Sequence, residues 1–120
     1  MIKLVQSLRR VANHLDDVRG IALVGADGLV VEALQLDPLA DMTTLAAELS
    51  VSRKDLHGAV RGAGMGGLNG FQIDTAEGCV QVVGVNDEYF LLMVIKPDGN
   101  PGRGRFYLRL EAERLAVELR

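Results

Sequence analysis

At 120 residues, the chain is long enough for one domain that buries about two-thirds of the surface exposed by its unfolded form. Its net charge of −3, its interspersed charges and its aromatic content of 4% exclude a basic nucleic-acid footprint and most base-stacking surfaces. Neither a membrane span of ~18 apolar residues nor a signal peptide is present, and Cys79 has no second cysteine, so we expect one cytoplasmic domain over residues 1–120.

The first two predicted elements are an amphipathic helix and a β-hairpin. Residues 1–17 carry apolar side chains at helical spacing, so one face of this helix is expected to pack on the core. These side chains are Leu4, Leu8, Val11 and Leu15. Residues 20–36 hold two apolar runs around Ala26-Asp27-Gly28, and Asp-Gly between such runs signals a hairpin because glycine adopts positive φ without steric cost. Since few polar residues lie on either face, we expect a central hairpin with both faces at least partly covered.

A long helix is predicted from Asp37-Pro38 to about Gly62, because aspartate caps free amides and proline suits the first helical position. One side of this helix is apolar and is expected to pack on the sheet: Met42, Leu45, Leu49, Leu56 and Val60. The opposite side, called here the small side, has these residues: Thr44, Ala47, Val51, Gly58 and Gly62. The small side either lets a second helix come close or is a weakly polar solvated face. Arg53 interrupts the apolar side, and we expect its guanidinium to reach outward.

A glycine-rich loop at residues 63–70 leads into a meander of three strands. The strands are expected at about residues 68–75, 79–85 and 89–96. The first of them alternates Phe71 and Ile73 with Gln72 and Asp74, which fits a one-sided edge strand. The last is apolar on both faces, which fits a central position.

The chain is predicted to end with a Gly/Pro loop at residues 97–105 and a helix over residues 106–120. The apolar stripe of this helix is Leu108, Ala112, Leu115 and Leu119. The predicted fold is an α/β sandwich, in which a five-stranded, mostly antiparallel sheet has helices on both faces in the order α-β-β-α-β-β-β-α.

The motifs that carry chemistry elsewhere do not form a site in this sequence. Residues 62–67 match G-x-G-x-x-G, but they leave a helix and enter a strand, the reverse of a dinucleotide-binding fingerprint. Arg103 and Arg105 are interpreted as solvated loop residues rather than phosphate ligands. His14 and His57 lie on different helices, so no metal site is predicted.

The remaining reactive residues are also interpreted as structural. Cys79 begins an apolar strand, which favours a buried thiol over a nucleophile. The acidic pairs Asp16-Asp17 and Asp87-Glu88 lie at a helix end and in a turn, and nothing in the sequence pairs them for acid-base work. We therefore expect no catalytic residues, no cofactor and no metal.

Several motifs follow one another in an order shared with a known family. They are LVGADGLVVEA at residues 23–33, the long helix after Asp37-Pro38, the meander with Glu77-Gly78 and residues 82–87, and Asn100-Pro-Gly102 leading into FYLRLEAERLA. With these motifs the whole chain resembles a Roadblock / dynein light chain domain of the stand-alone bacterial type. The glycine-rich GMGGLNG before the third strand departs from the family pattern.

This resemblance implies a homodimer, or a heterodimer with a related Roadblock-type chain. The long middle helices would pack antiparallel and the third strands would pair into one continuous sheet. The implied interface consists of the small side and the third strand: Thr44, Ala47, Val51, Gly58, Gly62, Gly70, Phe71, Gln72, Ile73 and Asp74.

The resemblance also implies a function. Bacterial members of this family are similar to regulators of small Ras-like GTPases in polarity, motility or signalling. Some act as GTPase-activating partners and others as scaffolds. Such a dimer can bias the GTPase switch regions without supplying an arginine finger, so the chain is expected not to be an enzyme. The candidate GTPase contacts are Arg53, Lys54, His57 and Arg61.

Two other classes of function stay open. A scaffold or adaptor subunit would assemble protein complexes without affecting GTP hydrolysis. A small-molecule sensor or enzyme would use the glycine-rich loops. Neither a nucleic-acid partner nor membrane insertion is expected.

Overall fold

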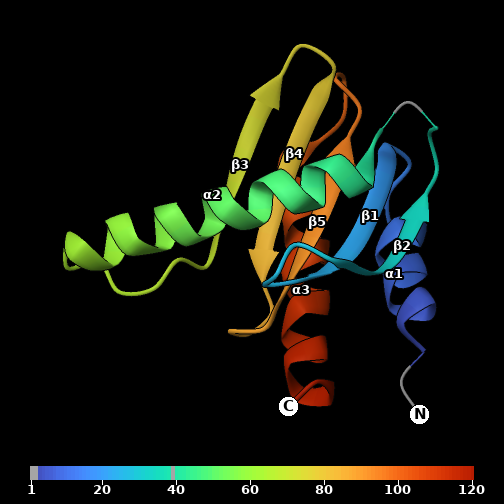
Figure 1. Ribbon diagram of the computed structural model, residues 1–120. Coiled ribbons are helices and arrows are strands. Elements are labelled where there is room, and N and C mark those ends of the chain that lie inside the picture. Colours follow the sequence, from blue (N-terminus) through green and yellow to red (C-terminus); the bar gives the residue numbers. More distant parts are fainter. Residues whose placement is uncertain (1–2, 39) are drawn as a thin grey trace.

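A computed structural model describes residues 3–38 and 40–120. The strands are β1 (Val18–Gly25), β2 (Val30–Gln35), β3 (Gly70–Thr75), β4 (Gly78–Gly84) and β5 (Tyr89–Ile95). They form one sheet in the order β2-β1-β5-β4-β3, and every neighbouring pair is antiparallel. Helices α1 (Leu4–Asn13) and α3 (Pro101–Glu118) cover one face, and α2 (Met42–Gly62) crosses the other (Figure 1). The predicted α/β sandwich and its order of elements are confirmed.

The sheet separates two apolar cores because side chains of the central strands alternate between its faces. Leu91, Met93 and Ile95 of β5 belong to the core beneath α1 and α3, whereas Phe90 and Leu92 belong to the core beneath α2. The predicted central position of this strand is therefore confirmed.

The predicted face of α1 is buried in the first of these cores, where Leu8 and Val11 are enclosed and Leu4 and Leu15 are partly covered. The helix is shorter than the predicted 1–17 because it ends at Asn13, and residues 1 and 2 lie outside the described residues.

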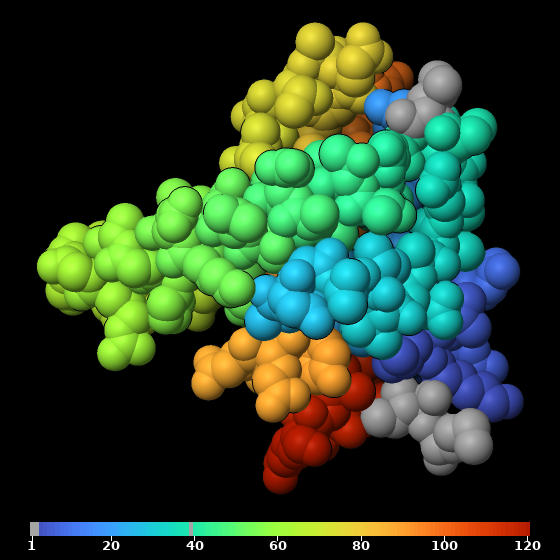
Figure 2. All heavy atoms as spheres, in the orientation of Figure 1, coloured from blue at the N-terminus to red at the C-terminus, as the bar shows by residue number. Residues whose placement is uncertain are grey.

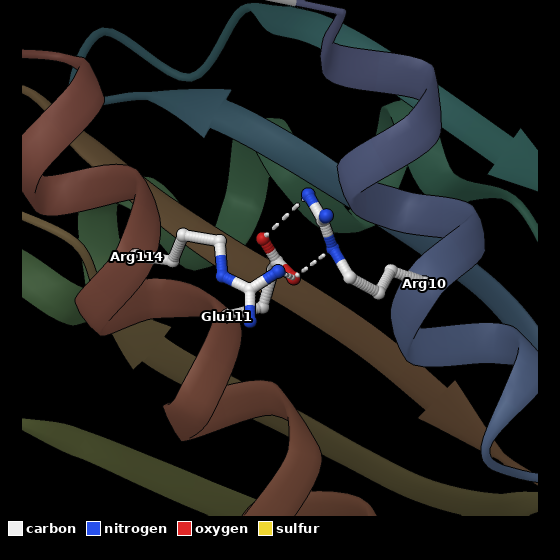
Figure 3. A network of polar contacts seen from close by, with 3 residues as sticks. All are labelled: Arg10, Glu111 and Arg114. Atoms are coloured by element: carbon white, nitrogen blue, oxygen red, sulfur yellow. Dashed lines mark hydrogen bonds and ion pairs between the residues drawn. The ribbon is translucent and has the colours of Figure 1, made fainter.

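A half-buried ion pair joins the two helices on this face. The carboxylate of Glu111 on α3 is 4% exposed and accepts a hydrogen bond from Arg10 Nε on α1 at 2.9 Å. Arg114 Nη1 lies 4.0 Å from the same carboxylate, so the Glu111 carboxylate is held between two guanidinium groups (Figure 3). The pair fixes α1 against α3 on top of their shared apolar core.

The predicted hairpin is present, but only one of its strands is central. β1 lies between β2 and β5 and is buried on both faces, whereas β2 is an outer strand with exposed apolar residues such as Val31. The expected central position is therefore wrong for β2. Its two faces are partly covered as expected, since Leu34 packs against the core beneath α1 and α3, and Val30 and Ala33 pack against the core beneath α2. Gly28 has a φ of +89°, and a Cβ on it would lie 2.7 Å from Ser50 Oγ of α2. Glycine is thus required here both for the turn and for the close approach of α2.

The predicted start of the middle helix at Asp37-Pro38 is wrong. α2 begins at Met42, and its N-cap is Asp41, whose Oδ1 accepts a hydrogen bond from Thr44 N at 3.0 Å. Asp37 has another partner, since its Oδ2 accepts a hydrogen bond from Arg19 Nε at 2.8 Å. Both aspartates are suitable caps by residue type, and the pairing of Asp37 with β1 decides between them. Position 39 lies outside the described residues.

The predicted Gly/Pro loop at residues 97–105 is also too long. α3 begins at Pro101, and Asn100 Oδ1 accepts a hydrogen bond from Arg103 N at 3.1 Å as its N-cap. Gly104 is buried inside the helix, and a Cβ on it would overlap the side chain of Ile95. This glycine allows the helix to approach the sheet closely, although in the sequence it resembles a loop residue.

Candidate functional site

The two halves of α2 have different surroundings. In the first half, Met42, Ala46, Leu49 and Ser50 are buried. Beyond Ser50 no residue of α2 is buried, and the helix projects past the sheet into open space (Figures 1 and 2). The apolar side predicted to pack on the sheet does so only as far as Leu49, because Leu56 is 40% exposed. The projecting half therefore exposes the apolar side chains Val51 and Leu56 and has no sheet of its own beneath it.

The free edge of the sheet lies beside this projecting half. β3 is the last strand of the sheet and pairs only with β4 among the described residues, so its other edge is open for pairing. Phe71 and Ile73 are opposite Val82 and Val80 of β4, whose side chains lie in the core beneath α2. The predicted edge strand is confirmed, and it exposes unpaired backbone and part of its apolar face together.

The small side of α2 is open to solvent in the single chain. All of its residues are exposed, and a Cβ at Gly58 or Gly62 would meet no atom within 4 Å. Ala47 also adjoins the hairpin turn, since its Cα would be 3.4 Å from a Cβ on Gly28. Among the described residues nothing occupies the small side, so its role in dimerisation stays a prediction.

Arg53 does not reach outward as expected from the sequence. Its guanidinium carbon is 5.3 Å from the ring centroid of Phe90, and its Nη2 donates a hydrogen bond to Asn86 O at 3.4 Å. Gly84 makes room for it, because a Cβ there would lie 3.0 Å from Nη2. Burial lowers the pKa of Arg53, and the nearby carboxylate of Asp87 opposes this shift. The cation remains charged and lies across the end of the sheet, where the ring face attracts it.

The other candidate GTPase contacts lie on the same half of α2. His57 Nδ1 accepts a hydrogen bond from Leu68 N at 3.1 Å, which ties the returning loop to the helix. Lys54 and Arg61 are exposed. Of the set, only Lys54 does not face the groove described next.

This α2–α3 groove, of about 660 Å³, is lined by the second half of α2, the end of β4 and the outer flank of α3. Arg53, His57 and Arg61 line one side, and Arg109 and Glu113 of α3 line another. The α3 residues are absent from the sequence-based set. No local pattern could have identified them, because only the packing of α3 on the sheet brings them near α2.

The residues considered for chemistry have structural roles. The His14 ring stacks on Tyr107 with centroids 4.4 Å apart, and Arg103 Nη2 donates a hydrogen bond to His14 O at 3.0 Å. Asp17 Oδ2 accepts a hydrogen bond from Asn100 N at 2.7 Å, which anchors the segment before α3. Cys79 is buried as predicted, and burial, followed by a hydrogen bond with Asp74, raises its pKa to about 11. A thiol with this pKa is unreactive at neutral pH.

Residues 3–38 and 40–120 hold no group of three or more histidine, cysteine, aspartate and glutamate side chains that could bind a metal ion. In the same part of the chain, no helix combines the length and the apolar character that a membrane span requires.

No protein-family model matches the chain, and no curated protein matches it. Solved structures do match. MglB with a tetrameric arrangement is similar at a TM-score of 0.85 and 16% identity, over 94% of this chain and 85% of that one. The Roadblock/LC7 domain from Streptomyces avermitilis is similar at a TM-score of 0.81 and 15% identity, over 92% of each chain. The gliding protein MglB from Thermus thermophilus is similar at a TM-score of 0.82 and 15% identity, over 94% of this chain and 85% of that one. The chain therefore has the Roadblock/LC7 fold that its sequence resembles.

Proposed function

We propose that this protein is a dimeric, non-enzymatic regulator of a small Ras-like GTPase. The observation that carries the proposal is the projecting half of α2 beside the free edge of β3. Exposed apolar side chains on a helix next to an open sheet edge form a surface that a second protein chain can cover. The likeness to MglB, including a tetrameric arrangement and a gliding protein, supports self-association and a regulatory role.

A second copy joined through β3 would extend the sheet beneath the projecting half of α2. Leu56 and Val60 continue the helix face that in the first half packs on the sheet through Leu49, and they would then have a sheet to pack on. In a two-fold arrangement, both copies bury these apolar side chains in the same way. The proposed interface is the small side of α2 together with residues 70–74 of β3.

The proposed GTPase contacts are the cations of the projecting half. Lys54 and Arg61 are exposed and available to a partner, whereas Arg53 and His57 hold the neighbouring turns in place. A dimer presents two such sets, so it can contact the mobile switch regions and favour one of their conformations.

The experiment that tests the partner is affinity capture from lysate containing either GDP or a non-hydrolysable GTP analogue. We expect a small Ras-like GTPase to be recovered mainly with the analogue, and to be recovered less by a Lys54→Glu, Arg61→Glu variant. Lys96→Glu is the control, because Lys96 is exposed but lies outside α2. Equal recovery with both nucleotides would instead indicate a scaffold subunit and would overturn the claim about switch regions.

The dimer is tested separately by Val51→Asp, which places a charge on the small side. Val51 is 58% exposed in the single chain, and Val117 on α3 is 60% exposed. We expect Val51→Asp to sediment as a monomer while Val117→Asp, the matched control, sediments as the dimer. An unchanged dimer for Val51→Asp would contradict the proposed interface.

A further inference from the structure

The α2–α3 groove continues along the outer flank of α3. A second hollow of about 360 Å³ is lined by residues of α3 alone, including Gly102, Arg105 and Phe106. Arg109 and Glu113 line both hollows, so the two adjoin along α3, and together they are called here the basic groove. It runs from the start of α3 to the flank of the projecting half of α2 that carries Arg53, His57 and Arg61.

The basic groove has a charge opposite to that of the whole chain. Four arginines line it against two carboxylates, Asp87 and Glu113, whereas the chain has a net charge of −3. Within residues 3–38 and 40–120, Arg61, Arg105 and Arg109 make no ion pair. These three guanidinium groups are thus available to carboxylates of another molecule.

The length of the groove favours an extended chain over a small ligand. From Gly102 to Ala116, α3 rises by about 21 Å, which about six residues of extended chain would span. Gly102 lines the groove and lets a backbone come close, because a Cβ there would have no neighbour nearer than Asn100 Oδ1 at 3.6 Å. Phe106 is 62% exposed and offers a place for one apolar side chain next to the arginines.

We propose that the basic groove binds an acidic, extended segment of a partner protein, with carboxylates at Arg61, Arg105 and Arg109 and one apolar side chain against Phe106. The inference deepens the proposed function and rests on it for the existence of a partner, since Arg53, His57 and Arg61 belong to both surfaces. It adds α3 to the recognition surface and assigns the partner segment a chemical character.

The test uses a fluorescein-labelled peptide of about ten residues, rich in Asp and Glu with one Leu, and measures fluorescence anisotropy with the full chain. We expect binding that weakens as salt increases, and that falls about tenfold for the Arg105→Glu, Arg109→Glu variant. Arg9→Glu, Lys96→Glu is the matched control, because both residues are exposed outside the groove and the change in charge is equal. The control should bind within about twofold of the original chain.

Amide chemical shifts of the unaltered chain provide a second measurement that does not depend on any variant. The peptide should shift the amides of Gly67, Gly84 and Gly102, which line the groove. The proposal would be overturned if the control variant weakened peptide binding equally, or if the amide shifts were confined to other surfaces. It would also be overturned if a single-stranded DNA of the same charge competed with the peptide equally well. The peptide experiment contains no GTPase, so the peptide can bind even where capture of a GTPase fails. A failure of this proposal is therefore distinguishable from a failure of the proposed GTPase partner.

Discussion

The two faces of the sheet use their helices in different ways. On one face, α1 and α3 share an apolar core and are joined by Arg10 and Glu111. On the other, α2 is the longest helix of the described chain at 21 residues, yet only its first half is buried. The first face therefore supplies stability within one chain, whereas the second face has a helix segment whose apolar residues Val51 and Leu56 are exposed in the single chain.

The largest loss of stability is expected on the α1/α3 face. Leu108 is fully buried between α3 and the sheet, so Leu108→Ala should lower the free energy of unfolding by about 2–5 kcal/mol. Leu110→Ala, on the exposed side of the same helix, is the matched control and should change it by less than about 1 kcal/mol. Urea unfolding measures both, and similar losses for the two variants would contradict this account of the face.

The half-buried ion pair of Arg10 and Glu111 is expected to contribute less than the apolar core beneath it. Glu111→Gln keeps the shape of the side chain but removes the charge that holds Arg10 and Arg114, so we expect a loss of about 1–3 kcal/mol in urea unfolding. Glu113→Gln on the exposed side of α3 should cost almost nothing. An equal effect of the two variants would mean that the pair does not fasten α1 to α3.

The cap of α2 gives a smaller effect that depends on pH. Hydrogen bonds from the backbone and hydroxyl of Thr44 lower the pKa of Asp41 below 3.8, so its stabilising contribution is present above about pH 4 and is lost as the pH falls further. Asp41→Ala should lower the melting temperature by a few degrees at pH 7, and the difference from the original chain should shrink in acid. Asp55→Ala, exposed on the same helix, is the control. A difference that stays constant down to pH 2 would exclude Asp41 as the cap.

The sequence predicts the order of elements because hydrophobic periodicity is a local property, and the edge position of β3 follows from its one-sided pattern. The errors occur where a tertiary contact chooses between equivalent local signals. Asp37 and Asp41 both suit a cap, and Arg19 pairs with Asp37. Gly104 resembles a loop residue until β5 approaches it.

The candidate site is likewise only partly predictable from local sequence patterns. Periodicity identifies Arg53 as an interruption of the apolar side, but only the position of Phe90 on β5 shows why its guanidinium stays inside. The small side of α2 and the strand next to it are visible in the sequence as patterns. Arg109 is not, because it lies beside Arg53 and Arg61 only after α3 has packed on the sheet.

The smallest effect expected is also the one that most directly compares the two halves of α2. Leu49 is 7% exposed and Leu56 is 40% exposed, although both occupy the apolar side of the helix. At protein concentrations low enough for monomers, Leu56→Ala should change the free energy of unfolding by less than about 0.5 kcal/mol, whereas Leu49→Ala should cost about 2 kcal/mol or more. At higher concentrations the cost of Leu56→Ala should rise, because a second chain would then cover this side chain and its truncation would weaken the dimer. Urea unfolding over a range of concentrations measures both variants, and a cost for Leu56→Ala that stays constant over that range would mean that the projecting half of α2 does not pack against a partner.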